Sequence, residues 1–339
     1  MSRRQALLAL GAAAMAGCAP TLAAEPRDAR RPATAALRSP AAAPRAAAAS
    51  DAASIETPSA LVEPVATPTE TSATLDASAS AERITLKLPP RDPGAETGSA
   101  FIARTKRLPR RELEEAIFQA IVAGNVPPFL RTLVPVDLSD RDADGGTHSA
   151  IIHVSCDYLA VGSDDDFLNI PMTARTAQRL AVKLHCILPT PKLVREIWRH
   201  ADVKLKPLYI DGGPDPDLDR HDDYAVHKTM LDEQRAALHP RLGALTAGNK
   251  KDIVVTNRLV DHPGKVAIYG WQKRSGKPIQ PLSTRHSAIY ADYSHGVRLV
   301  ADTVLVDGVE QPIAHVLCDG KLCPLLTDEG PLEVLEYPI

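Results

Sequence analysis

The chain has 339 residues, of which 24% are charged, and its formal net charge at pH 7 is −3. This balance excludes electrostatic binding to nucleic acid, because phosphate recognition needs clustered lysine and arginine and the chain has no basic tract. The sequence has no internal repeat and no apolar segment of the length that a transmembrane helix requires. Its composition divides it into residues 1–18, a biased stretch over 19–95 and a globular part over 96–339.

Residues 1–18 have the layout of an export signal. Arg3 and Arg4 precede a short apolar stretch, and a pair of small residues stands directly before Cys18. This end resembles the lipobox of bacterial lipoproteins, and its basic head resembles a twin-arginine signal. The resemblance implies an exported protein anchored to an envelope membrane by lipid on Cys18, with its domain facing the periplasm or the cell surface. The alternative is an ordinary cleaved signal peptide with an incidental cysteine.

Residues 19–95 are predicted to be a disordered tether. They are rich in alanine, proline, threonine and serine and contain few large apolar side chains. Such a stretch buries too little apolar surface to offset the entropy of ordering it, and its prolines interrupt every candidate helix. We expect the folded unit to begin between Glu82 and Phe101 and to form a single domain.

The globular part alternates between helical and strand patterns. Apolar periodicity and capping residues predict helices over residues 109–124, 173–185, 190–198 and 223–238. Alternating apolar residues predict strands over residues 129–136, 148–155, 158–161, 252–257, 265–272, 277–282, 288–300 and 303–306. An acidic loop over 139–147 and a hairpin turn at Asp307-Gly308 are also expected. Helices in the middle of the chain with strands at both ends favour an α+β fold with a largely antiparallel sheet.

Four cysteines besides Cys18 belong to the globular part: Cys156, Cys186, Cys318 and Cys323. An even number in an exported protein permits two disulfides, and a turn-rich loop joins the last two cysteines. Buried free thiols are the alternative, because a twin-arginine substrate folds in a reducing compartment. Cys156 is also a candidate nucleophile, although its surroundings indicate a strand and not the helix N-terminus that lowers a thiol pKa.

The densest group of reactive side chains lies in residues 286–298. On an unbroken strand, one face would carry His286, Tyr290, Asp292 and Ser294. A local nucleophilic triad of Ser294, His286 and Asp292 is excluded, because the strand rise separates His286 from Ser294 by about 26 Å.

Asp292 and His295 form the better pair. Gly296 suggests a bulge that would turn His295 onto the face of Asp292. The carboxylate would then favour the protonated imidazole and orient it as a general base or a metal ligand, with His286 assisting. The alternative is a structural pair whose hydrogen bonds hold the bulge.

Groups elsewhere could complete this site. His227 and the run Lys250-Lys251-Asp252 are candidates, and the cations near His295 favour an anionic envelope polymer as partner. The acidic run at residues 164–166 lacks the spacing of an EF-hand loop. No motif identifies a zinc, nucleotide or dinucleotide cofactor, so the cofactor is unknown.

The run from Tyr290 to Val300 resembles a signature of an uncharacterised family of exported bacterial proteins. Residues 124–127, 189–190 and 268–271 are similar to other segments of that family. The resemblance covers residues 98–338 and implies one folded unit without naming an activity. Two hypotheses follow: a hydrolase of cell-wall or extracellular polymer that uses His295, Asp292 and His286, or a non-catalytic envelope binding or scaffolding module.

Overall fold

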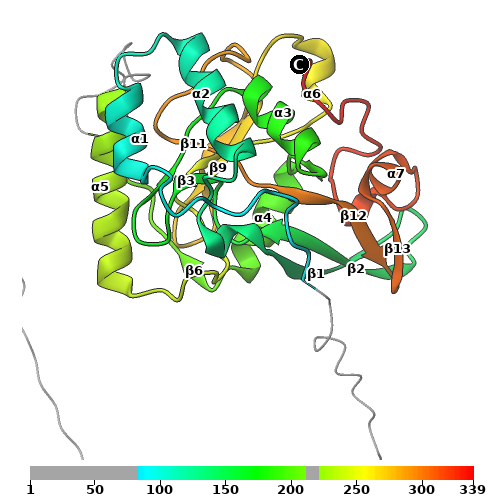
Figure 1. Ribbon diagram of the computed structural model, residues 1–339. Coiled ribbons are helices and arrows are strands. Elements are labelled where there is room, and N and C mark those ends of the chain that lie inside the picture. Colours follow the sequence, from blue (N-terminus) through cyan, green and yellow to red (C-terminus); the bar gives the residue numbers. More distant parts are fainter. Residues whose placement is uncertain (1–82, 211–220) are drawn as a thin grey trace, which may run out of the picture. The chain divides into compact units, whose positions relative to one another are not determined.

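The computed structural model describes residues 83–210 and 221–339 (Figure 1). These residues form an α+β fold with mainly antiparallel sheets and with helices in the middle of the chain, as predicted. Cys18 and residues 19–82 of the expected tether lie outside the described residues.

Seven α-helices belong to the described part of the chain. They are α1 (Gly98–Thr105), α2 (Arg110–Val122), α3 (Ala174–Lys183), α4 (Pro191–His200), α5 (His221–Leu238), α6 (Arg258–Asp261) and α7 (Ile313–Cys318). Helices α2 to α5 confirm the four predicted helices, whereas α1, α6 and α7 were not predicted. All three of the latter are short, so periodicity carries little signal in them.

Local capping explains where α4 begins. The hydroxyl of Thr190 accepts a hydrogen bond from the Leu193 backbone N–H at 3.1 Å. Pro191 occupies the first helical position, where its missing N–H costs nothing. Leu193 and Ile197 then face the core together, because residues four apart share one side of a helix.

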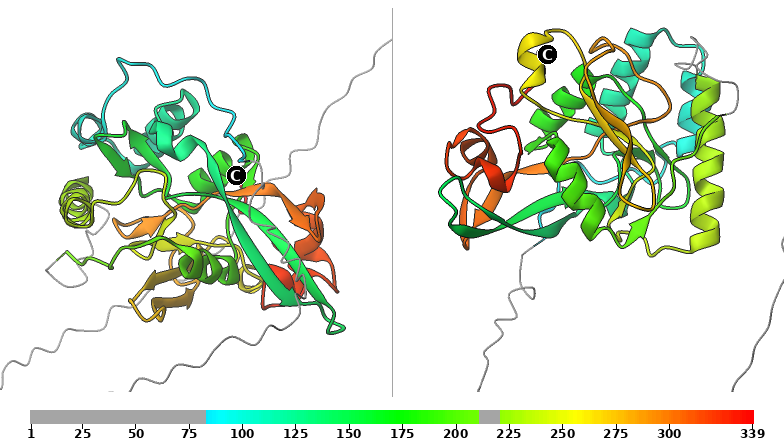
Figure 2. Two further views of the ribbon diagram at one scale, coloured as in Figure 1. Left: turned by 90° about the horizontal axis from the view of Figure 1, so that it is seen from below. Right: turned by 180° about the vertical axis from the view of Figure 1, so that it is seen from behind.

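The larger sheet has the strand order β1-β2-β12-β13, with β5 also paired to β12. Its strands are β1 (Leu133–Arg141), β2 (Thr147–Ser155), β12 (Val300–Val306), β13 (Val309–Pro312) and β5 (Cys186–Ile187). Figure 2 shows the long β1–β2 hairpin beside β12 and β13. Asp307 and Gly308 both have positive φ, as a type I′ turn requires, so the predicted hairpin turn is confirmed.

The second sheet has the order β10-β9-β8-β11 and carries the candidate site. Its strands are β10 (Pro278–Ser283), β9 (Ile268–Gln272), β8 (Lys251–Ile253) and β11 (His295–Gly296). Strands β8 and β11 run parallel to each other. Two small sheets pair β3 (Ala160–Gly162) with β4 (Phe167–Asn169) and β6 (Val203–Lys204) with β7 (Thr246–Ala247). Side chains from both larger sheets join one hydrophobic core.

The β1–β2 hairpin corrects two predicted boundaries. Residues 128–131 form a 3₁₀ turn, and β1 begins at Leu133. The strand continues to Arg141, through part of the expected loop, because its pairing with β2 extends to Arg141–Thr147. The polar residues 139–141 are compatible with a strand here because their side chains are exposed.

The domain also begins earlier than residue 96. Leu86 is buried, its N–H donates to the carbonyl of Arg131 at 2.7 Å, and Leu133 N–H donates to the carbonyl of Ile84. Gly124 accommodates this segment: a Cβ there would lie 2.3 Å from the Pro89 carbonyl oxygen. Residues 83–95 therefore belong to the folded unit, since a few aliphatic side chains and backbone pairing are sufficient to fix them.

The four cysteines of the domain are free thiols. Cys156, Cys186 and Cys323 are buried and Cys318 is exposed, so neither the two disulfides that the sequence permits nor the short bridge between Cys318 and Cys323 is formed. Free thiols were the alternative expectation.

Leu86→Ala should lower the free energy of unfolding by about 2–3 kcal/mol, because it removes a buried aliphatic side chain and leaves a cavity. Denaturant unfolding of the full chain measures this change. The matched control is Leu242→Ala, which removes an exposed leucine and should leave stability nearly unchanged. Equal stability of the two variants would contradict an ordered segment at residues 83–95.

Candidate functional site

Residues 288–294 do not form the predicted strand. The carboxylate of Asp292 accepts a hydrogen bond from Ser294 N–H at 2.8 Å, and its backbone carbonyl accepts one from His295 N–H at 3.1 Å. This local turn ends the extended conformation, since aspartate side chains compete with sheet pairing for nearby N–H groups. The expected alternation of His286, Asp292 and Ser294 along one strand face is therefore wrong.

Gly296 is required by close packing and not by a bulge. A Cβ at this position would lie 2.6 Å from Cβ of Lys250 and 2.6 Å from the ring of Tyr158. Only glycine lets β11 approach so closely, and His295 and Gly296 then pair in register with Lys251 and Asp252 of β8. The predicted bulge is replaced by a short parallel pairing.

This pairing brings His295 and Asp292 together with a lysine. Directly paired residues point to the same face of a sheet, so His295 and Lys251 are neighbours. The Oδ2 atom of Asp292 lies 4.0 Å from His295 Nε2 and 3.9 Å from Lys251 Nζ. The pair predicted from the sequence is adjacent, but its two side chains are not hydrogen-bonded to each other.

The imidazole of His295 is fully buried, and neither of its ring nitrogens has a hydrogen-bond partner among the described residues. Burial lowers the pKa of His295 to about 4, although the negative charge of Asp292 acts to raise it. At neutral pH the ring is therefore neutral. The expected preference for the protonated form is wrong, because the loss of solvent outweighs a carboxylate 4.0 Å away.

Asp292 is ionised despite its burial. Burial opposes the charge, but three favourable effects hold the pKa of Asp292 well below its ordinary value. They are the charge that His295 carries at the low pH where this carboxyl titrates, the Lys251 ammonium, and the hydrogen bonds from Ser294. The Ser294 hydroxyl donates to Oδ1 at 2.5 Å and the Tyr290 hydroxyl to Oδ2 at 3.2 Å. The carboxylate is thus fixed in place beside a neutral imidazole.

His286 reaches this group only through Tyr290. The exposed His286 ring stacks on Tyr290 with the centroids 4.2 Å apart. The half-buried Tyr290 ring lies edge-on to His295 at 5.7 Å. His286 is therefore at the outer side of the site, where it interacts with Asp292 through the electrostatic field and not through a hydrogen bond.

The other face of β8 holds a second polar group. Lys250 is buried, and its Nζ lies 3.2 Å from His227 Nδ1 and donates to the Tyr293 carbonyl at 2.6 Å. Burial lowers the pKa of Lys250 to about 7 and that of His227 to about 2. Both residues were sequence candidates from other elements, and the structure brings them together behind the His295 pair.

Further buried polar groups surround β8. Asp252 Oδ2 accepts a hydrogen bond from the Tyr158 hydroxyl at 2.9 Å, and burial raises the pKa of Asp252 to about 7. The amides of Asn249 and Gln272 are buried without partners among the described residues. Sequence reasoning missed Tyr158, Asn249 and Gln272. One local signal was available for Asn249, which directly precedes the candidate run Lys250-Lys251-Asp252.

Two sequence candidates do not contribute. The Cys156 thiol is buried and donates to the Phe129 carbonyl at 3.4 Å, and burial raises its pKa to about 12, which disfavours a thiolate nucleophile. In the acidic run at 164–166, Asp166 forms an ion pair with Lys228 at 2.9 Å. Over the described part of the chain, no three His, Cys, Asp or Glu side chains are grouped to hold a metal ion.

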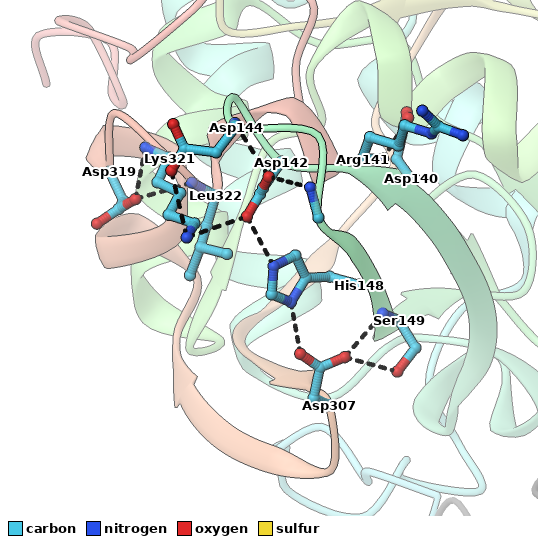
Figure 3. Close-up of polar contacts among 11 residues, drawn as sticks. Asp140, Arg141, Asp142, Asp144, His148, Ser149, Asp307, Asp319, Lys321 and Leu322 are labelled. Carbon is cyan, nitrogen blue, oxygen red and sulfur yellow. Dashed lines mark hydrogen bonds and ion pairs between the residues drawn. The ribbon is translucent and has the colours of Figure 1, made fainter.

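A separate polar cluster links the ends of the two hairpins (Figure 3). His148 of β2 lies between two carboxylates, with Nε2 3.0 Å from Asp142 Oδ2 and Nδ1 2.6 Å from Asp307 Oδ2. Lys321 Nζ lies 3.3 Å from both Asp142 and Asp144. We call these five residues the hairpin clamp, because they connect the β1–β2 turn to the β12–β13 turn and to the segment after α7.

The spacing Asp140-x-Asp142-x-Asp144-Gly145 in this cluster is typical of the first half of a calcium loop. Ile151 occupies the position of the bidentate glutamate in such a loop. Asp140 pairs with Lys192 and points away from the cluster (Figure 3), while Lys321 supplies the positive charge to the other two. The arrangement is that of a salt-bridge network.

The clamp should make stability depend on pH. Hydrogen bonds to Asp307 and Asp142 raise the pKa of His148, so its stabilising contribution is complete below pH 6.5 and disappears as pH rises through the higher folded value. The free energy of unfolding of the wild type should therefore exceed that of His148→Gln most strongly near pH 5.5, and the difference should shrink above neutral pH.

The matched control is His262→Gln, which changes an exposed histidine. Its difference from the wild type should stay small over the same pH range. A constant difference between wild type and His148→Gln from pH 5.5 to 9 would contradict the protonated clamp. Asp142 does not titrate in the pH range of this experiment. Burial favours its neutral form, but hydrogen bonds from His148, Gly146 and Lys321 lower its pKa to about 2.

No family model, curated protein or solved structure matches this chain. The resemblance to an uncharacterised exported family therefore stays a prediction. Over residues 83–210 and 221–339, none of the helices combines the length and the apolarity that a membrane span requires.

Proposed function

We propose that the protein is an exported envelope lipoprotein, anchored through Cys18, whose domain hydrolyses a cell-wall or extracellular polymer. The observation that carries the hydrolase proposal is a buried, neutral imidazole with two unpartnered ring nitrogens, held beside an ionised carboxylate and a lysine. A satisfied structural histidine would use at least one ring nitrogen in a hydrogen bond.

In this proposal His295 is the general base. Its neutral ring accepts a proton from water, and the resulting hydroxide forms a bond to the electrophilic carbon of the substrate. The bond to the leaving atom then breaks, and His295 returns the proton to that atom. Asp292 stabilises the transient imidazolium across 4.0 Å, and the Lys251 ammonium is the nearest cation for the developing negative charge.

Access to His295 passes Tyr290. This side chain is half-buried, donates to Asp292 and lies edge-on to His295, while His286 packs on its outer face. We infer that the substrate displaces the Tyr290 ring, with His286 assisting at the mouth of the site. This role for His286 differs from direct proton transfer, because no contact joins it to Asp292.

His295→Gln should reduce hydrolysis by about 100- to 10,000-fold, because an amide does not act as a base and general-base catalysis contributes that factor. The measurement is the release of soluble fragments from envelope polymers by the purified protein, with the thermal midpoint recorded alongside. His262→Gln, a change of an exposed histidine, is the control and should retain full activity. An active His295→Gln protein that stays folded would overturn the proposal.

The pH profile gives an independent test. Because the pKa of His295 is about 4, the active neutral ring predominates at higher pH, and kcat/KM should fall as pH drops through about 4. Asp292→Asn removes the carboxylate that favours protonation, so the acid limb should shift to lower pH. A limb near pH 6.5 that is insensitive to Asp292→Asn would contradict His295 as the base.

The second candidate is a non-catalytic binding module, which the complete burial of His295 favours. In that case the His295 pair would hold the loop over β8, and exposed residues such as Tyr209 and Ile289 would contact the partner. The discriminating result is a His295→Gln protein that binds polymer normally when the wild type shows no hydrolysis. Unfolding of His295→Gln would likewise favour this structural role.

The lipid anchor has its own test. Cys18→Ala should shift the protein from the membrane fraction to the soluble fraction or leave it unprocessed, because the thioether to lipid forms only on cysteine. Cys318→Ala, which changes an exposed cysteine of α7, should remain in the membrane fraction. Identical soluble behaviour of the wild type and Cys18→Ala would contradict lipidation.

A further inference from the structure

An open cavity of about 710 Å³ lies beside the C-terminal end of α5 and next to β6. Its wall combines the segment that follows β6, the last turns of α5 and the tip of the β9–β10 hairpin. Residues of this wall that matter here are Lys204, Lys206, Leu208, Gln234, Leu238 and Arg274. We call this cavity the α5 groove.

The α5 groove carries an excess of positive charge. Lys204, Lys206 and Arg274 line it, against one carboxylate, that of Asp202. Lys206 and Arg274 are exposed and form no ion pair with another described residue. Asp202 already accepts a hydrogen bond from the Leu245 N–H. The two unpaired cations are therefore available to an anionic ligand.

The backbone of the groove wall is fixed before any ligand arrives. The Gln234 side chain accepts a hydrogen bond from Lys206 N–H at 2.6 Å and donates to the Lys206 carbonyl at 3.2 Å. Lys204 lies over the Trp198 ring at 5.0 Å and donates to the Ala201 carbonyl. A preordered wall reduces the entropy that binding would otherwise cost.

Aromatic side chains continue from the groove to the candidate site. Tyr209 follows the groove residue Leu208, is half exposed and lies 4.4 Å from the Trp271 ring. Lys251 Nζ lies 4.8 Å from the same Trp271 ring and 3.9 Å from the carboxylate of Asp292. A chain of contacts thus connects the α5 groove to the proposed catalytic pair.

We propose that the α5 groove and Tyr209 bind an acidic polysaccharide, a polymer of sugars that carry carboxylates. The proposal rests on the proposed hydrolase function, for which it names the substrate class. Carboxylates would pair with Lys206 and Arg274, and the apolar faces of sugar rings would pack on Tyr209 and Leu238. Cations beside exposed apolar surface fit such a ligand better than a neutral sugar or a uniformly charged polymer.

The test is equilibrium binding of galacturonic acid hexamers to the full chain at low salt. The double variant Lys206→Glu with Arg274→Glu should bind about tenfold or more weakly, because two charge-assisted contacts become repulsive. Tyr209→Ala should also weaken binding. The matched control is Lys273→Glu, an exposed lysine next to Arg274 that does not line the groove, and it should bind like the wild type.

The ligand comparison includes the methyl-esterified hexamer and poly-L-glutamate. Weaker binding of both, and loss of hexamer affinity with rising salt, would support an acidic polysaccharide. Equal binding of the methyl ester, tighter binding of poly-L-glutamate, or no effect of the double variant would overturn the proposal.

His295→Gln separates this inference from the proposed function. Unchanged hexamer affinity in His295→Gln together with loss of hydrolysis would support both proposals. Binding by a wild type that hydrolyses none of these polymers would support the groove as a binding site and overturn the hydrolase alone. Hydrolysis that survives the double variant with unchanged KM would overturn the groove alone.

Discussion

The close approach of β11 to β8 is the constraint on which the candidate site depends. It is possible because Gly296 leaves the space that Tyr158 and Lys250 occupy. The pairing lasts for two residues, yet it sets His295 beside Lys251 and directs Lys250 to the opposite face. A larger residue at this point would separate the strands and disperse both polar groups together.

Burial acts differently on the two carboxylates near this pairing. Asp292 stays ionised because three hydrogen-bond donors and a neighbouring lysine favour its charged form. Asp252 accepts from Tyr158, and burial raises its pKa to about 7. Positively charged neighbours and hydrogen-bond donors together therefore outweigh burial at Asp292, whereas burial dominates at Asp252.

Local signals in the sequence were sufficient for helices α2 to α5 and for the hairpin turn at Asp307-Gly308. Threonine caps, prolines and the Asp-Gly turn act on the backbone within a few positions, so their effect does not depend on how distant segments pack. The strand expected over 288–300 failed because Asp292 makes a turn with its own neighbours. The partner of β11 is β8, more than forty residues earlier, and no local pattern encodes such a pairing.

The same limit applies to side-chain groups. The adjacency of Asp292 and His295 was predicted, although from a bulge at Gly296, whereas a local turn and the pairing of β11 with β8 produce it. Two other contacts depend on how distant segments pack. One joins His227 of α5 to Lys250, and the other joins His148 to Asp307. The degree to which a side chain is buried is also set only in the folded domain. For this reason the sequence predicted a protonated His295, whereas burial lowers its pKa and keeps the ring neutral.

The free thiols have a practical consequence. Cys318 on α7 is exposed, whereas burial raises the thiol pKa of Cys156 and Cys186 to about 12. A thiol-reactive fluorophore should therefore label the domain at one preferred position, and Figure 1 places α7 at the opposite end of the domain from α5. The native sequence thus carries an attachment point from which to immobilise the domain or report its rotation without obstructing the polar groups around β8.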